Sequence, residues 1–163
     1  LSLGMSHYID NPELRERLRK DWRTDGQEQT WTALTALLTY QEPTDGLYFA
    51  SPGVELKHNK RIGRLSSLSG ATEYLHDSYR SHLQSPGRPH TVGLGLGHEF
   101  LLGKFRFSQQ FFFYLLKPEV QAADVYQRYG LMYALNEGWS VGVNLKAHGH
   151  VADFIDLRIA RRL

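Results

Sequence analysis

The chain has 163 residues and a formal net charge of +2, a balance that argues against a general nucleic-acid-binding protein. It contains no cysteine, which excludes disulfide bonds and thiolate metal sites. Hydrophobic residues make up 41% of the chain, but the most apolar stretch, 111–116, is far shorter than the roughly 20 residues of a membrane helix. A membrane β-barrel remains open, because only alternate residues of its strands face lipid.

The N-terminal part is expected to hold a strand and the one helix of the chain. Residues 1–9 are strand-like, and no signal peptide precedes them, so we expect either that an export signal was removed or that the chain starts partway through a longer protein. Pro12 follows a helix start signal, and Leu14, Leu18 and Trp22 then recur every four residues among basic side chains. This pattern predicts a short amphipathic helix at 12–22, resting either on the domain or at a membrane surface.

The rest of the sequence alternates with the period of two that is typical of β-strands. In 139–147, for example, Trp139, Val141 and Val143 alternate with small or polar residues. Including the first segment, we predict about nine antiparallel strands at 1–9, 29–41, 47–58, 64–77, 91–100, 105–116, 126–136, 139–147 and 153–162. A soluble β-sandwich or lipocalin-like barrel would give the same alternation.

Three features favour a transmembrane β-barrel over these soluble folds. The predicted strands are long enough to cross a bilayer with tilt. One face is apolar, and the other is polar and rich in glycine, which suits a lumen better than a dry core. Aromatic residues gather near the predicted strand ends, as in an interfacial belt: Phe100, Phe105 and Trp139 at one end, and Tyr40, Tyr48, Phe49, Tyr126 and Tyr129 at the other. The residues expected to face lipid near the C-terminus are Trp139, Val141, Val143, Leu145, Ile155, Leu157 and Ile159.

The connections predict the orientation of this barrel. Short turns at 59–63, 101–104 and 136–138 are expected on the periplasmic side, and loops at 42–46, 78–90, 117–125 and 148–152 on the outer side. Nine strands would bring the first and last together in parallel, which bacterial single-chain barrels avoid. We therefore expect one domain over 1–163 that is the C-terminal part of a longer, incomplete barrel.

His76 and Ser78 form the only His-x-Ser sequence in the chain. Residues two apart on a strand share a face, so the imidazole of His76 can take a proton from the hydroxyl of Ser78. The acids that are near in sequence, Glu73 and Asp77, fall on the opposite face. The pair is therefore a candidate catalytic pair, which chance alone would also explain.

A second polar cluster is expected at the outer rim. Four polar residues near strand ends fall on positions that alternate towards the inside of the barrel: Lys146, His148, Arg128 and Glu73. Asp153 begins the next strand. The cluster either binds a phosphorylated headgroup, since lysine and arginine suit phosphate, or holds neighbouring strands together. We expect no metal site, because no third ligand accompanies His148 and His150, and we expect no cofactor.

Several motifs resemble one known family. They are Gly97-His98-Glu99-Phe100, Gly103-Lys104-Phe105, residues 125–131, Leu145-Lys146-Ala147-His148 and Ala152-Asp153-Phe154-Ile155-Asp156. These segments resemble the C-terminal half of acyloxyacyl hydrolase or lipid A deacylase-like barrels of Bacteroidota, most firmly from about Thr91 to Leu163.

The resemblance implies a serine esterase of the bacterial outer membrane that removes an acyl chain from lipid A of lipopolysaccharide, using histidine, serine and an acid. It also implies that the His-x-Ser motif of relatives lies upstream of this chain. His76 and Ser78 match its spacing but not its neighbours, since no Asn-Gly pair follows. The alternative is a non-enzymatic outer-membrane barrel, either a structural subunit or porin-like.

Overall fold

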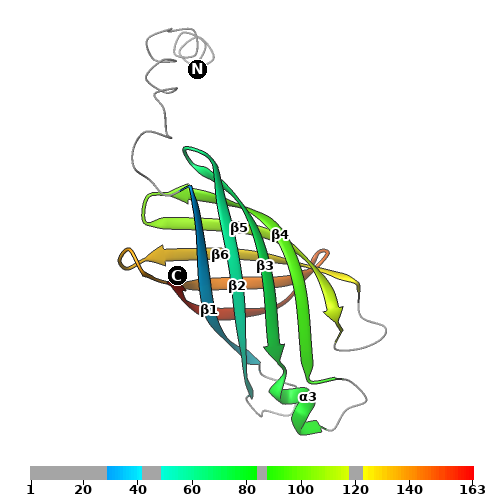
Figure 1. Cartoon of the computed structure of the whole chain (residues 1–163). Helices are drawn as coiled ribbons and strands as arrows, with labels where there is room; N and C mark the ends of the chain where they lie inside the picture. Colours follow the sequence, from blue (N-terminus) through cyan, green and yellow to red (C-terminus); the bar gives the residue numbers. More distant parts are fainter. Residues whose placement is uncertain (1–28, 42–48, 84–87, 118–122) are drawn as a thin grey trace, which may run out of the picture.

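The computed structural model describes residues 29–41, 49–83, 88–117 and 123–163. Within them, eight strands form a closed antiparallel barrel (Figure 1). The strands are β1 (Thr30–Gln41), β2 (Phe49–Gly63), β3 (Ser66–His76), β4 (His90–Leu102), β5 (Phe105–Leu116), β6 (Val125–Ala134), β7 (Trp139–His148) and β8 (Val151–Arg162). The single helix of the described part, α3 (Ser78–Leu83), lies between β3 and β4.

Closure of the barrel corrects the expectation of nine strands and an incomplete wall. β1 pairs with β8 in antiparallel register, from Ala33 opposite Arg162 to Thr39 opposite Asp156. An even number of strands allows this pairing, so no further strand is needed to close the sheet. The predicted strand at 1–9 and the predicted amphipathic helix at 12–22 lie outside the described residues.

The two ends of the barrel differ in their connections. We call the end where β2 meets β3, β4 meets β5 and β6 meets β7 the turn end, and the opposite end, which carries α3, the loop end (Figure 1). The predicted turn at 59–63 is wrong, because β2 continues to Gly63 and only residues 64–65 separate it from β3. Part of the predicted loop at 78–90 is helical, but no helix in the described ranges has the length and apolarity to cross a membrane.

Glycine permits two of the tightest hairpins. Gly103 begins the two-residue connection between β4 and β5, and Gly149 begins the one between β7 and β8. Their φ angles are +67° and +62°, which side chains with a Cβ atom rarely adopt. A positive φ at this position matches the twist of two-residue hairpins, so the predicted 148–152 loop is in fact a tight turn.

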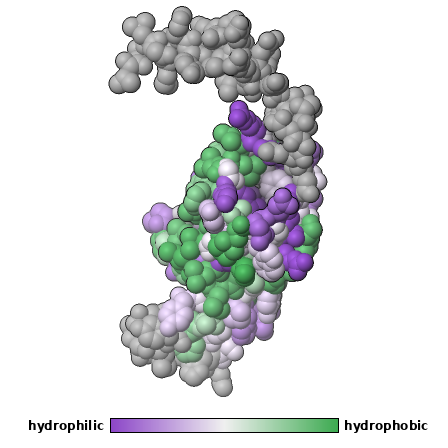
Figure 2. All heavy atoms as spheres, turned by 90° about the vertical axis from the view of Figure 1, so that its left-hand side faces the viewer, coloured by the Kyte–Doolittle hydropathy of each residue, from purple (hydrophilic) through white to green (hydrophobic). Residues whose placement is uncertain are grey.

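The outward face of the barrel is apolar, as the alternation predicts. Leu96, Ile155 and Leu157 are each at least 60% exposed, and Trp139, Val143 and Ile159 also point outward. Figure 2 shows apolar side chains covering much of the barrel wall on the side that it presents. This face has no partner within the described chain, which is the pattern of a strand surface that meets lipid.

The inward face is polar and closely filled. Buried glutamate, serine, asparagine, glutamine, lysine and arginine side chains line it, together with a few aromatic rings. Tyr126 belongs to this face: it is 2% exposed and stacks on Phe112, so its assignment to an interfacial belt is wrong. Its position is even-numbered, like that of inward Arg128 on the same strand, and parity decides its direction.

Glycines on β4 make room for these rings. A Cβ atom added at Gly95 would lie 2.7 Å from the Phe112 ring, which is closer than real Cβ atoms approach a neighbour. The small inward residues of β4 therefore let large side chains from β5 and β6 fill the lumen. An eight-stranded barrel is just wide enough for such filling.

Candidate functional site

A network of buried charges crosses the lumen and connects opposite walls of the barrel. Arg128 on β6 donates to Glu73 on β3 at 2.5 Å and to Asp156 on β8 at 2.6 Å. Arg158 on β8 donates to Glu55 on β2 at 2.8 Å, to Glu73 at 2.9 Å and to Asp156 at 2.6 Å. All five side chains are at most 3% exposed.

The network pairs charges that would otherwise be costly to bury. Three carboxylates share two guanidinium groups, and Tyr126 donates a further hydrogen bond to Glu73 at 3.2 Å. Ion pairs and hydrogen bonds offset the cost of burying charge, and this arrangement supplies ion pairs at five side chains from four strands. Arg128 and Glu73, two members of the predicted rim cluster, are thus engaged with each other inside the barrel.

Lys146 lies next to this network, towards the loop end, in a cage of aromatic rings. Its Nζ atom is 4.5 Å from the ring centroid of Tyr126, 5.1 Å from that of Tyr114 and 5.3 Å from that of Phe154. These distances are within the range of cation–π attraction. The residue is 5% exposed, so the rings and not bulk water surround most of its side chain.

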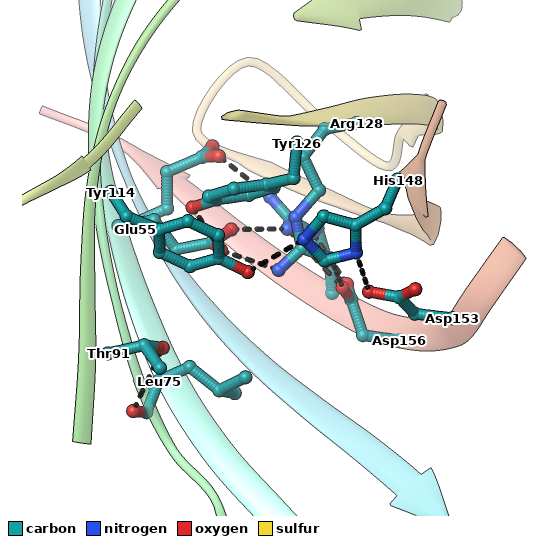
Figure 3. Close-up of polar contacts among 11 residues, drawn as sticks. Glu55, Leu75, Thr91, Tyr114, Tyr126, Arg128, His148, Asp153 and Asp156 are labelled. Carbon is teal, nitrogen blue, oxygen red and sulfur yellow. Dashed lines mark hydrogen bonds and ion pairs between the residues drawn. The ribbon is translucent and has the colours of Figure 1, made fainter. Parts of the chain in front are cut away.

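His148 and Asp153 form the outermost layer of the polar lumen. The Nδ1 atom of His148 lies 2.6 Å from Oδ2 of Asp153, and its Nε2 atom lies 3.2 Å from the hydroxyl of Tyr114. Figure 3 shows Asp153 and Tyr114 on opposite sides of the imidazole, with the charge network beside them. The two side chains of the pair are 28% and 25% exposed, so they are reachable from the loop end.

A β-bulge brings Asp153 to His148. Along β8, outward Ile155 and Leu157 share the odd parity of Asp153, which would direct its carboxylate away from the lumen. The pairing of β7 with β8 shifts here: Lys146 faces Phe154, but the next residue, Ala147, faces Ala152. Asp153 is therefore the extra residue of a bulge, a feature that locally re-aims a side chain.

The pairing fixes what the imidazole can do. A carboxylate at Nδ1 favours the tautomer that carries its proton there, which leaves the Nε2 lone pair free to accept one. The hydroxyl of Tyr114 donates to that lone pair. The arrangement can therefore act as an oriented general base at the mouth of a polar lumen, with a phenol in contact with its accepting nitrogen.

His76 and Ser78, the catalytic pair proposed from sequence, lie against different partners. His76 lies at the end of β3 with its Nδ1 atom 3.4 Å from that of His90. The hydroxyl of Ser78 donates to the backbone oxygen of Ala50 at 2.8 Å, and its backbone N–H donates to Ser51. Glu73, the nearest acid along the strand, points into the lumen towards Arg128.

Several members of the site escaped the sequence analysis. Glu55, Asp156 and Arg158 complete the buried network, and Tyr114 contacts the imidazole. The sequence did contain one indication of them: Asp156 and Arg158 are charged residues at inward-facing positions of β8, where they alternate with apolar residues. Parity alone does not say which strands meet across a lumen, so the partners were not foreseeable.

The lumen beyond the network, towards the turn end, is also polar. Lys57 pairs there with Glu99, and Arg106 donates to the hydroxyl of Ser140 at 2.5 Å. A cavity of about 10 Å³, with room for about one water molecule, lies between Arg158 and Arg106. In the described residues, no three or more histidine, aspartate or glutamate side chains are grouped to hold a metal ion.

Comparison with known proteins gives one family. The family model described as "Acyloxyacyl hydrolase, C-terminal domain" matches residues 27–163, which include all eight strands and every residue of the site. No curated protein matches the chain.

Proposed function

Because the chain belongs to the acyloxyacyl hydrolase family, whose C-terminal domain it matches over 27–163, we propose that it is an outer-membrane barrel that hydrolyses an acyl ester of lipid A. The observation that carries the proposal is the His148–Asp153 pair at the loop end of the lumen. The pair supplies an oriented general base within the matched domain. It lies at the loop end of the barrel, which the connections between strands predict to face outwards. Lipid A esters of the outer leaflet would approach that end.

In this proposal His148 acts as the general base. Its Nε2 atom removes a proton from the water molecule whose oxygen forms a bond to the ester carbonyl carbon. The tetrahedral intermediate then expels the alcohol of lipid A, and the imidazolium returns the proton to that leaving oxygen. Asp153 holds the ring and stabilises its charged form, and the products are a free fatty acid and a lipid A molecule with one more hydroxyl group.

Lys146 is the member of the site best placed to meet a negatively charged substrate group. Both terminal nitrogens of Arg128 are engaged by carboxylates, whereas the Lys146 ammonium is surrounded by rings close to the base. We propose that it attracts the phosphate groups or the developing oxyanion, and that Arg128 and Glu73 support the site from below. His76 and Ser78 remain the second proposal for the catalytic pair, and the experiment below separates the two.

The rival function is a non-enzymatic barrel. The hydroxyl that contacts His148 belongs to a tyrosine, and the Ser78 hydroxyl is bound to a backbone oxygen, which favours a structural role. A porin-like role is disfavoured, because buried side chains from opposite walls meet across the lumen at the charge network.

The test measures fatty acid release. The full chain is refolded in detergent micelles and incubated with hexa-acylated lipid A, and the products are followed by mass spectrometry. We expect release by the wild type and a loss of about 100-fold or more for His148→Gln and Asp153→Asn, the range that general base catalysis contributes. Ser78→Ala should retain wild-type activity.

The other outcomes decide between the alternatives. If Ser78→Ala abolishes release and His148→Gln does not, the base belongs to the His76–Ser78 pair. If the folded wild type releases no fatty acid from lipid A, the barrel is non-enzymatic and the proposed hydrolysis is wrong.

A further inference from the structure

A pair of histidines lies outside the lumen, at the loop end of β3 and β4. His76 is the last residue of β3 and is the register partner of His90, the first residue of β4. Their parity is that of Tyr74, which is 38% exposed on the outward face, and opposite to that of buried Glu73 and Leu75. The pair is therefore separate from the His148–Asp153 site.

The two rings point the same type of nitrogen at each other. The Nδ1 atoms of His76 and His90 are 3.4 Å apart, and the ring centroids are 5.0 Å apart with planes inclined by 37°. The hydroxyl of Tyr74 lies 2.8 Å from Nδ1 of His90. Three donor atoms from two adjacent strands thus converge on one small volume.

The nitrogen–nitrogen distance is that of two ligands of one metal ion. With metal–nitrogen bonds of about 2.0–2.1 Å and a tetrahedral angle, two imidazole nitrogens on zinc lie roughly 3.3–3.4 Å apart. A direct N–H···N hydrogen bond would bring them closer, since usual donor–acceptor distances are about 2.7–3.2 Å. The rings are therefore spaced for an ion between them and are too far apart for a good hydrogen bond to each other.

We propose that His76 and His90 bind a divalent transition metal ion of the zinc or copper type at the outer wall of the loop end. Imidazole nitrogen is a ligand that these ions favour. The phenol oxygen of Tyr74 is the nearest candidate for a third position, and water supplies the rest. Because the ligands are the residues that end β3 and begin β4, a bound ion joins the two strand ends that flank α3. This inference is independent of the proposed hydrolysis.

The test is a zinc titration of the full chain, prepared without a histidine tag and refolded in detergent micelles. Calorimetry with zinc chloride should show one ion bound per chain. His76→Gln and His90→Gln should each weaken binding by at least about tenfold, as expected for the loss of a ligand. His58→Gln is the matched control, because His58 is also an exposed strand histidine but bonds to Thr32. Circular dichroism and the migration of unheated samples in gels verify that each variant folds.

The proposal fails if the folded wild type shows no heat of zinc binding, or if His76→Gln and His90→Gln bind zinc as the wild type does. Loss of binding on His148→Gln instead would place the ion at the lumen site and would equally overturn it. Tyr74→Phe decides the third ligand: unchanged affinity leaves two imidazoles as the protein's contribution, and weaker binding adds the phenol.

Discussion

Replacing Arg128 with methionine tests whether the buried charge network holds the barrel together. Arg128 is fully buried and pairs with Glu73 at 2.5 Å and Asp156 at 2.6 Å. Removing one partner from a buried ion pair costs about 3–5 kcal/mol, because a charge is left without compensation. Both carboxylates keep a bond to Arg158, so we expect the lower end of this range, about 3 kcal/mol.

Lys146 provides the matched control in the neighbouring layer. It is as deeply buried as the network, and its ammonium packs against three aromatic rings while also attracting the carboxylate of Glu73. Cation–π attraction contributes up to about 2 kcal/mol, and the desolvation of the ammonium offsets much of it. A methionine at this position packs against the same rings, so Lys146→Met should change stability by less than about 1 kcal/mol.

The assay is a urea titration of the refolded barrels in detergent micelles, followed by tryptophan fluorescence. Stability is compared through the midpoint at a constant m value, since a changed m value would signal a different unfolded or native state. The reasoning is refuted if Arg128→Met unfolds at the wild-type midpoint, or if Lys146→Met falls as far as Arg128→Met does.

Two further substitutions test the two faces of β4, each with a control on the same or the adjacent strand. Leu96 points outward at the middle of β4, so Leu96→Arg should cost about 2–4 kcal/mol in a bilayer. Leu102 lies at the turn end, so Leu102→Arg should cost at most about 1 kcal/mol. Equal losses would contradict a lipid-facing wall. Gly95→Ala would place a methyl group 2.7 Å from Phe112 and should destabilise the barrel by about 1–3 kcal/mol. Gly70→Ala meets no atom closer than 3.9 Å and should be tolerated. Urea midpoints decide both predictions, and a harmless Gly95→Ala would show that the rings can move.

The sequence was sufficient to predict most of the barrel wall. Period-two alternation located all eight strands from β1 to β8, and parity assigned Val143, Ile155 and Leu157 to the outward face. These successes share one cause, which is that the side-chain direction of a strand residue is a local property. The same rule, applied to Tyr126, would have placed it in the lumen; proximity to a strand end was the weaker signal.

The closure of the barrel and the pairing of side chains inside it were not predictable in the same way. Whether β1 meets β8 depends on the tilt and stagger of every strand, which no single segment encodes. Likewise, parity placed Arg128 and Glu73 on the inward face, but their contact spans the lumen between β6 and β3. A sequence pattern therefore predicts which residues face the lumen, whereas the geometry of the barrel determines which of them form pairs.

The side chain of Asp153 does not point in the direction that strand alternation predicts. A bulge interrupts the pairing of β7 with β8 at this residue, and a bulge leaves one residue outside the ladder. The ion pair that the bulge permits, between Asp153 and His148, is partly exposed, and such pairs contribute at most about 1 kcal/mol. Stability is therefore a weak reason for the irregularity, because the disturbed ladder offsets much of that gain. The proposed hydrolysis supplies a stronger reason, because it requires an oriented imidazole at the mouth of the lumen.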